Sequence, residues 1–408
     1  MMSGVFARLV GQQTVEAELL AAARSSRRDS AHSAVTAGGM SHAWLITGPP
    51  GSGRSIAAVC FAAALQCTAE DVEGGPGCGR CRACTTTMAG THADVRRVVP
   101  EGLSIGVDEM RAIVQVASRR PGTGRWQIVV IEDADRLTEG AANALLKVVE
   151  EPPPSTVFLL CAPSVDPEDI AITLRSRCRH VALVTPAPAA IAQVLIATDG
   201  LDAETAEWAA AVSGGHVGRA RRLATDPEAR QRRQRALALA RDAATPSRAF
   251  AAVDELVAAA ESEARDLTAE RAEAETEELR TALGAGGTGK GTAGTLRGTA
   301  GVIKDLERRQ KSRQTRASRD ALDRALIDLA TYFRDALLAA SGVGTARPSH
   351  PDMADAVAAM AAHAPAAALL RCIEAVLECR EALAVNVKPR FAVGAMVATI
   401  GQALRADL

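Results

Sequence analysis

A glycine-rich loop between an apolar strand and an apolar helix constrains the fold of this chain more than any other sequence feature. Residues 48–55 follow the apolar run Ala43–Ile46, and an Ala- and Val-rich helical segment starts near Ile56. This order matches the phosphate-loop pattern G-x-x-x-x-G-K-[ST], except that Arg54 replaces the lysine. A strand, a glycine-rich loop and a helix in this order predict an α/β domain. The loop consists of Gly48, Pro49, Pro50, Gly51, Ser52, Gly53, Arg54 and Ser55.

Further apolar runs predict more strands of the same sheet. They are Gln127–Ile131, Val157–Cys161 and Val181–Val184, and a helical pattern that ends at Pro152 separates the first two. Strands that alternate with helices through about residue 184 predict a parallel sheet flanked by helices. After Thr185 the strand signal disappears, and the remaining sequence is typical of helices.

The length of 408 residues predicts two or three domains at ~150 residues each. We expect a nucleotide-binding-like domain over residues 1–185, a small helical lid domain over 186–244 and an all-helical domain over 245–408. Within the last, the Gly/Thr-rich residues 284–301 predict a flexible excursion. Residues 284–290 also spell G-x-x-x-x-G-K, but no apolar strand precedes them, so we exclude them as a nucleotide site.

Composition narrows the function classes. Aromatic residues make up 2% and hydrophobic residues 48%, so aliphatic side chains must form the core. With 47 basic and 48 acidic residues, the chain is not expected to coat nucleic acid by bulk charge. No run of about 18 apolar residues predicts a membrane span, and we expect a cytoplasmic protein with no membrane partner.

The phosphate-loop chemistry is altered in two places. Backbone N–H groups of such a loop hold phosphates and Ser55 would bind Mg²⁺, but the guanidinium of Arg54 is planar and bulkier than an ammonium group. Mg-ATP binding and a loop that keeps only its shape both stay open. An acidic pair follows the strand Gln127–Ile131 as Glu132-Asp133, the reverse of the usual Asp-Glu order. A carboxylate displaced by ~1.5 Å can cost ~10²-fold in rate, so this site predicts slow hydrolysis.

Cysteines in a C-x₂-C-x₂-C cluster predict a metal site. Cys78, Cys81 and Cys84 form the cluster, and Cys67 lies upstream as a fourth thiolate, with His92 as an alternative. Four thiolates favour structural Zn²⁺ with no open position. Free buried thiols are the other interpretation, but the glycine-rich segment between the cysteines offers little core to bury them.

Several segments together resemble the clamp-loader branch of the AAA+ ATPases, and within it the delta-prime subunits of bacterial DNA polymerase III. They are FARLVGQQTVEAEL, SHAWLITGPPGSGRS, the cysteine cluster, NALLKVVEEPPP and SRC, in family order over about residues 5–222. The third domain matches only in helical character and position, and its Gly/Thr-rich excursion resembles actinobacterial versions.

The resemblance implies roles for particular residues and partners. Cys67, Cys78, Cys81 and Cys84 would be the family's zinc module, and Arg177 of SRC its arginine finger, which acts on the neighbouring subunit. Taken alone, Arg177 and the arginines at 175 and 179 are typical of a solvated edge. The implied partners are gamma/tau and delta subunits in a hetero-pentamer joined by a helical collar, the sliding clamp, and primer-template DNA in the replisome.

Further departures favour a non-hydrolysing stator. Gly215-His216-Val217-Gly218 stands where the motor subunits keep a sensor arginine, with Arg219 one residue late, and Cys161-Ala162-Pro163 replaces a polar sensor residue. An ATP-hydrolysing gamma/tau-type motor is the alternative. A different AAA+ remodeller or a stand-alone DNA-binding module is a second one, disfavoured by the near-neutral charge. We expect no polymerase chemistry from this chain.

Overall fold

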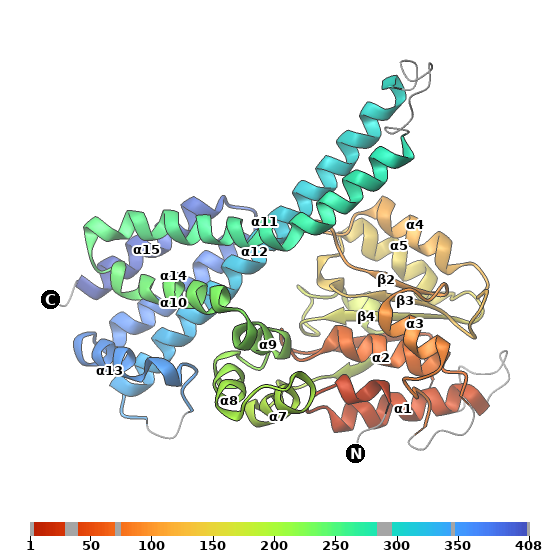
Figure 1. Ribbon diagram of the computed structural model, residues 1–408, viewed down its shortest axis with the longest axis horizontal. Coiled ribbons are helices and arrows are strands. Elements are labelled where there is room, and N and C mark those ends of the chain that lie inside the picture. Colours follow the sequence, from red (N-terminus) through yellow and green to blue (C-terminus); the bar gives the residue numbers. More distant parts are fainter. Residues whose placement is uncertain (1–3, 29–39, 70–74, 284–295, 344–346, 406–408) are drawn as a thin grey trace. The chain divides into compact units, whose positions relative to one another are not determined.

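The protein is described here from a computed structural model (Figure 1). It divides into two compact units, Met1–Pro100 with Ser104–Ala224, and Glu101–Leu103 with Thr225–Leu408. The division into domains at residues 185 and 244 stays a prediction. The structure describes residues 4–28, 40–69, 75–283, 296–343 and 347–405.

A five-stranded parallel sheet organises the first unit, with the order β2-β3-β4-β1-β5. Central strands β1, β3 and β4 are buried along their whole length, as a parallel sheet covered on both faces requires. The predicted parallel α/β domain followed by helices is therefore confirmed. The strands are β1 (Ala43–Thr47), β2 (Val95–Val98), β3 (Gln127–Ile131), β4 (Thr156–Ala162) and β5 (Arg179–Ala182).

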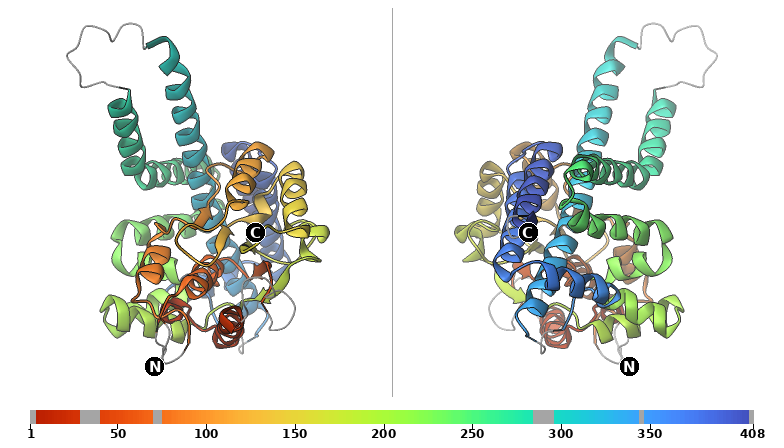
Figure 2. Two further views of the ribbon diagram at one scale, coloured as in Figure 1. Left: turned by 90° about the vertical axis from the view of Figure 1, so that its right-hand side faces the viewer. Right: turned by 90° about the vertical axis from the view of Figure 1, so that its left-hand side faces the viewer.

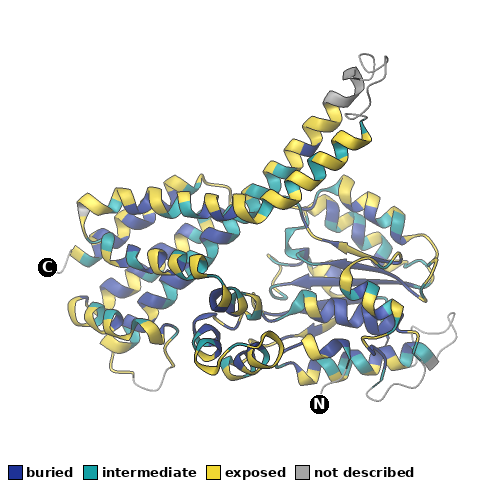
Figure 3. Cartoon of the chain, in the orientation of Figure 1, coloured by how far each residue is buried: buried dark blue, intermediate teal, exposed yellow. Residues whose placement is uncertain are grey.

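Successive strand residues belong to two different cores, one on each face of the sheet. The strands of the sheet are mostly coloured as buried in Figure 3. Trp44 and Ile46 of β1 join the core with η1, α1 and α2, whereas Ala43 and Leu45 join the core with α4 and α5. Helix α3 packs on α2. These helices are η1 (Val5–Arg8), α1 (Gln13–Arg28), α2 (Arg54–Gln66), α3 (Arg82–Ala89), α4 (Val107–Ala117) and α5 (Glu139–Glu150).

Short helices complete the first unit. Residues Ser213–Gly215 lie between α8 and α9, and Gly214 and Gly215 both have positive φ angles. The 3-10 helix η2 follows β3, and α6 precedes β5. These elements are η2 (Ala134–Arg136), α6 (Ile172–Arg175), α7 (Pro188–Asp199), α8 (Ala203–Val212) and α9 (Val217–Thr225).

The second unit is all-helical around an aliphatic core that includes Leu326, Phe333, Val376 and Val393. The far ends of α11 and α12 run as a helical pair beyond the other helices of this unit (Figure 2). Its elements are α10 (Pro227–Asp242), α11 (Pro246–Ala282), α12 (Leu296–Ala340), η3 (Pro351–Met353), α13 (Ala354–His363), α14 (Ala366–Ala384) and α15 (Pro389–Arg405).

The predicted excursion at 284–301 needs correction at its end. Residues 284–295, which include the rejected 284–290 motif, lie outside the described residues, but α12 already begins at Leu296. Single glycines cost only about 1 kcal/mol in a helix, so Gly298 and Gly301 do not stop it. Across the described ranges, no single helix is long and apolar enough to span a bilayer. One pair of helices, Pro351–His363 and Ala366–Ala384, has the length and composition of a membrane span when the two are taken together, but the pair is bent by 118°.

Candidate functional site

Three of the predicted segments meet at the carboxyl edge of the sheet. The glycine-rich loop follows β1, the acidic pair follows β3, and Cys161 lies near the end of β4. The Gly48 N–H donates to Pro163 O at 3.2 Å, which ties the loop to the end of β4. Ligands of open parallel sheets bind at this edge, so the arrangement has the position of a nucleotide site.

The loop keeps the backbone shape that its glycines predict. Gly51 and Gly53 have φ angles of 87° and 97°, a region that favours glycine, and α2 begins at the next residue with its N-terminus towards the loop. A Cβ on Gly51 would lie 2.5 Å from the Cβ of His216, so this histidine lies directly against the loop. Ser52 is buried, and its Oγ has no hydrogen-bond partner in the described part of the chain.

Gln12 holds the loop from the N-terminal side, a contact that the sequence did not predict. Its Nε2 donates to Ser52 O at 3.2 Å, and its Oε1 accepts a hydrogen bond from the Val184 N–H at 3.2 Å. Gln12 lies within the GQQ segment that contributed to the family resemblance, which was the available signal.

The guanidinium of Arg54 is turned onto its own loop. Its Nη1 donates to Gly48 O at 3.0 Å. Burial, and then Asp133, raise the pKa of Asp135 above its usual value, while Arg54 lowers it, so the guanidinium lies within electrostatic reach of the acidic segment after β3. A phosphate-loop lysine instead directs its ammonium group to the phosphates.

The first carboxylate of the acidic pair is also engaged within the chain. Glu132 Oε1 accepts hydrogen bonds from Arg97 Nε at 2.8 Å and from Arg97 Nη2 at 2.6 Å. The Glu132 side chain is 14% exposed and that of Arg97 is 37% exposed. Arg97 belongs to β2, which the sequence did not predict, so the partner of Glu132 was missed.

Arg177 lies at the surface, after α6 and before β5. Its Nη2 lies 2.5 Å from Glu150 Oε1, and both side chains are 40% exposed. The two flanking arginines have different contacts. Arg175 donates to Val165 O at 3.3 Å, whereas Arg179 pairs with a glutamate of α1 and lies 4.7 Å over the Trp44 ring.

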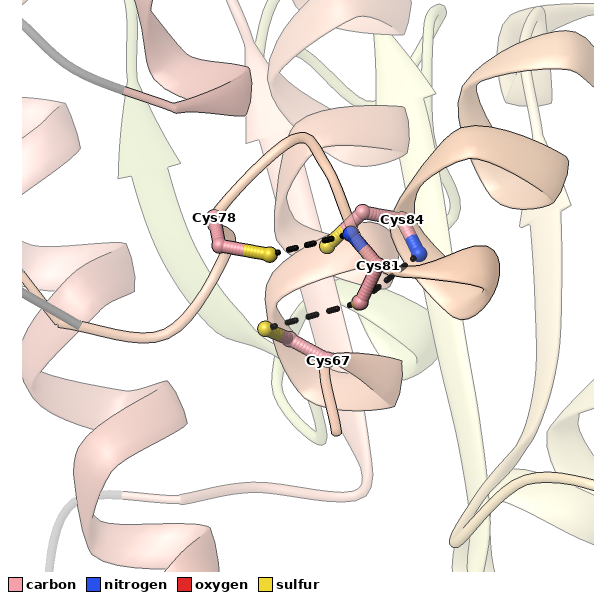
Figure 4. Close-up of side chains that lie close together, drawn as sticks. All are labelled: Cys67, Cys78, Cys81 and Cys84. Atoms are coloured by element: carbon pink, nitrogen blue, oxygen red, sulfur yellow. Dashed lines mark hydrogen bonds between the residues drawn. The ribbon is translucent and has the colours of Figure 1, made fainter. Parts of the chain in front are cut away.

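The four predicted cysteines form one cluster (Figure 4). Their Sγ atoms all lie within 4.8 Å of one another. Cys67 follows the end of α2, and Cys81 caps the N-terminus of α3, where its Sγ accepts the Cys84 N–H at 3.5 Å. Cys78 Sγ accepts the N–H groups of Arg80 and Cys81 at 3.4 and 3.3 Å.

This donor set fits a metal ion such as Zn²⁺. The contact between the Cys67 and Cys84 thiols lowers the pKa of Cys67 and raises that of Cys84, so without a metal the two share a proton, which metal binding would release. Four thiolates at this spacing can complete a tetrahedral shell. His92 is not part of the cluster: its Nδ1 accepts the Asp94 N–H at 3.1 Å.

Two solved structures match most of the chain, both with low TM-scores. A DNA polymerase III gamma subunit-related protein of Thermotoga maritima is 15% identical, with a TM-score of 0.35 and coverage of 89% of this chain and 94% of that one. The clamp loader delta protein of Bacillus subtilis is 13% identical, with a TM-score of 0.28 and coverage of 90% and 96%.

Two protein-family models match the sequence. The model described as DNA polymerase III, delta subunit, matches residues 27–187, and the model described as DNA polymerase III, delta subunit, C terminal, matches residues 317–388. The first range contains every predicted site residue: the glycine-rich loop, the acidic pair, the cysteine cluster and Arg177.

Curated relatives match less than half of this chain. The delta-prime subunit of Escherichia coli K12 is 39% identical over 147 residues, 36% of this chain and 43% of that protein. The delta-prime subunit of Pseudomonas aeruginosa is 38% identical over 185 residues, 45% and 55% of the two chains. The tau subunit of Bacillus subtilis is 36% identical over 140 residues, 34% and 24% of the two chains. The chain thus spans about half the length of the delta-prime relatives it matches. Over the region that carries its candidate sites, the chain is similar to the delta and delta-prime subunits of DNA polymerase III.

Proposed function

We propose that this chain is a delta-prime-type subunit of the replicative clamp loader, and that it acts as a stator without turning over ATP. The family model over residues 27–187 and the delta-prime relatives support the subunit assignment. The observation that carries the stator assignment is the Arg54–Gly48 hydrogen bond, because the cation expected to hold phosphate is bound to the loop's own carbonyl group.

The acidic pair supports the same conclusion. Hydrolysis needs a carboxylate that serves Mg²⁺ and a second one that orients the attacking water. Glu132 is instead paired with Arg97 by two hydrogen bonds, which offsets its charge. His216 lies against Gly51 in place of a sensor arginine. Zn²⁺ bound to Cys67, Cys78, Cys81 and Cys84 would supply a structural cross-link only.

In the proposed ring, Arg177 supplies positive charge to the ATP site of a neighbouring gamma/tau subunit. Its 40% exposure suits a contact with another chain, and its guanidinium group, which pairs with Glu150, would have to exchange that partner for the neighbour's phosphate. Arginine fingers of this kind are worth ~10³–10⁵ in rate at the site they serve. The loader, completed by delta, would then open the sliding clamp and release it on primer-template DNA.

The test is Arg177→Ala in a loader reconstituted with gamma/tau, delta, sliding clamp and primed DNA. We expect the variant to assemble normally, while clamp loading and DNA-stimulated ATPase fall by roughly tenfold or more, since one interface loses its finger. Arg175→Ala is the matched control, because Arg175 is a neighbouring exposed arginine that, like Arg177, donates to a backbone carbonyl group of its own chain. Equal rates for Arg177→Ala and the control would refute the finger assignment.

A gamma/tau-type motor is the second candidate function, and one observation favours it. The tau subunit of Bacillus subtilis and the gamma/tau subunit of Mycobacterium tuberculosis match 34% and 43% of this chain, at 36% and 32% identity. A motor must bind Mg-ATP at its own loop, so micromolar binding by the isolated chain would favour this candidate over the stator.

A further inference from the structure

The loop that leads into the cysteine cluster also contacts the N-terminal segment, Gly4–Gln12. The Val5 N–H donates to Gly77 O at 2.9 Å, one residue before Cys78. On the other side, the Cys60 thiol of α2 donates to Val5 O at 3.1 Å. The backbone of Val5 is therefore held both by α2 and by the loop that the cluster fixes.

Glycines allow the two backbones to approach this closely. A Cβ on Gly4, which has a φ of +92°, would lie 2.2 Å from Gly77 O. A Cβ on Gly77, with a φ of +99°, would lie 2.9 Å from the Cγ2 atom of Val5. Both positions need glycine for conformation and for space, so the contact depends on these two residues.

The other end of the cluster is tied to α1. Arg27, near the end of that helix, donates from Nη2 to Cys67 O at 2.6 Å and from Nη1 to Ala69 O at 2.7 Å. The Arg24 guanidinium lies against Gly75, where a Cβ would meet its Nε at 2.7 Å. The cluster thus contacts the chain on both sides of residues 9–12.

The N-terminal segment in turn reaches the phosphate loop. Val5, Phe6, Leu9 and Gln12 are all buried. A Leu9 methyl group lies 3.3 Å from the position of a Cβ on Gly53, and Gln12 donates to Ser52 O. Contacts therefore run without a break from the cysteine cluster, through residues 4–12, to the phosphate loop.

We propose that the metal bound by the four cysteines positions the N-terminal segment and, through Gln12, the phosphate loop. Metal binding would hold the backbone of Cys67 and of Gly77, which precedes Cys78, in place. Gly77 then hydrogen-bonds Val5 and Cys67 hydrogen-bonds Arg27, so residues 4–28 are held at both ends. Gln12, within this segment, hydrogen-bonds Ser52 of the phosphate loop. The inference concerns the first unit alone and does not depend on the proposed function. It assigns Gly77 and Gln12 as positioning residues rather than catalytic ones.

Hydrogen exchange of the full chain tests this proposal, with one Zn²⁺ bound per chain and after removal of Zn²⁺ by a chelator. We expect amide exchange in residues 5–12 and 51–55 to rise by about tenfold or more without Zn²⁺, while α14 in the second unit is unchanged. A rise confined to residues 67–84, or an equal rise throughout the first unit, would overturn the proposal.

Substitutions separate positioning from simple stabilisation. Gly77→Ala keeps all four thiols, so we expect it to retain Zn²⁺ and yet to exchange faster in residues 5–12. Gly200→Ala is the matched control, since Gly200 also has a positive φ of 67° but no atom within 4 Å of its Cβ position. Wild-type exchange in a zinc-loaded Gly77→Ala variant would contradict the proposal.

Gln12→Ala provides a second test if Gly77→Ala does not fold. In this variant the link to Ser52 is lost and only the Leu9–Gly53 contact remains, so removal of Zn²⁺ should raise exchange in residues 5–9 as in wild type but raise it less in residues 51–55. Equal zinc dependence of residues 51–55 in Gln12→Ala and wild type would overturn the role of Gln12.

Discussion

Asp94 shows how one buried carboxylate can organise a loop of the α/β domain. It is 5% exposed and accepts hydrogen bonds from the N–H groups of Gly122, Thr123 and Gly124, and from the Thr123 hydroxyl, at 2.6–2.8 Å. Burial raises the pKa of Asp94, but these donors outweigh burial and hold it at about 2. The ionised carboxylate therefore stabilises the turn that precedes β3.

The variant Asp94→Asn should lower the free energy of unfolding by about 2 kcal/mol at pH 7. Because the folded pKa lies below the unfolded value, this contribution is present above about pH 4 and is lost as the pH falls towards 2. Urea unfolding followed by tryptophan fluorescence measures it, since all three tryptophans lie in the first unit. Asp108→Asn, at a 92% exposed side chain, is the control. An equal loss at pH 7 and pH 3 would contradict this account.

In the helical unit, His350 is a buried titratable residue whose pKa is also shifted by its surroundings. It is 2% exposed, and its Nδ1 lies 2.7 Å from Nη2 of Arg233. Arginine can only donate, so Nδ1 accepts and the proton resides on Nε2, which contacts Thr331 Oγ1 at 2.9 Å. Burial, and then Arg233, lower the pKa of His350, while three aspartates oppose them: Asp328, Asp335 and Asp352.

Acidification should therefore destabilise the helical unit through His350. Because the pKa of His350 is lower in the folded than in the unfolded chain, its contribution to the free energy of unfolding is complete above the unfolded pKa, about 6.5. Below that pH the contribution is lost, by up to about 1 kcal/mol per pH unit. We expect His350→Gln to flatten the pH dependence of thermal unfolding between pH 7.5 and 5.5, followed by circular dichroism. The exposed His363 provides the control, His363→Gln. Parallel pH profiles for wild type and His350→Gln would exclude this role.

At the scale of elements, polar side chains join the far ends of α11 and α12. Glu275 accepts hydrogen bonds from Arg313 Nη1 and Nη2 at 2.8 and 2.7 Å and from Arg271 Nε at 2.9 Å. The Gln310 amide donates to Ala272 O at 3.0 Å and to Thr276 Oγ1 at 3.2 Å. Hydrogen bonds with Arg313 lower the pKa of Glu275 to about 2, so the pairs persist across the neutral range.

We expect Glu275→Gln to weaken this helical pair by about 1 kcal/mol at low salt and by less at high salt, because its ion pairs are partly exposed. Hydrogen exchange of residues 302–313 at the two salt concentrations measures the effect. Glu277→Gln is the matched control, since Glu277 lies 3.7 Å from Arg280 and both side chains are mostly exposed. Identical exchange in the two variants would show that Glu275 does not join the helices.

Among the strands, sequence patterns predicted those that are buried along their whole length and missed the partly exposed β2. The runs that became β1, β3 and β4 are continuous and apolar, whereas β2 is a four-residue strand with two exposed arginines. The strand predicted at Val181–Val184 lies at Arg179–Ala182, because Arg179 packs on Trp44 and His180 pairs with Thr47.

The candidate sites divide in the same way. The cysteine cluster could be predicted because its ligands lie close together in sequence and share one chemistry. The Glu132–Arg97 pair could not, since it depends on β2 lying beside β3. The hydrogen bond from Arg54 to Gly48 O could not be predicted either, because it depends on the backbone geometry of the loop and not on the spacing of residues in the sequence.

In the molecule as a whole, the phosphate loop and Arg177 belong to one domain but have different surroundings. The phosphate loop keeps its shape, but its cation and the first carboxylate of the acidic pair are engaged within the chain, through Gly48 and Arg97. Arg177 also has a partner within the chain, Glu150, but both side chains of this pair are 40% exposed at the surface. We therefore propose that this chain serves the nucleotide site of a neighbour and leaves its own site without ATP.

Calorimetric titration of Mg-ATP into the zinc-loaded chain tests this claim most directly. A gamma/tau subunit serves as the positive control, and circular dichroism confirms that the chain is folded. The account predicts no saturable heat up to about 1 mM Mg-ATP. Stoichiometric binding with a micromolar Kd would contradict it, because Arg54 would then have to leave Gly48 and serve the phosphates.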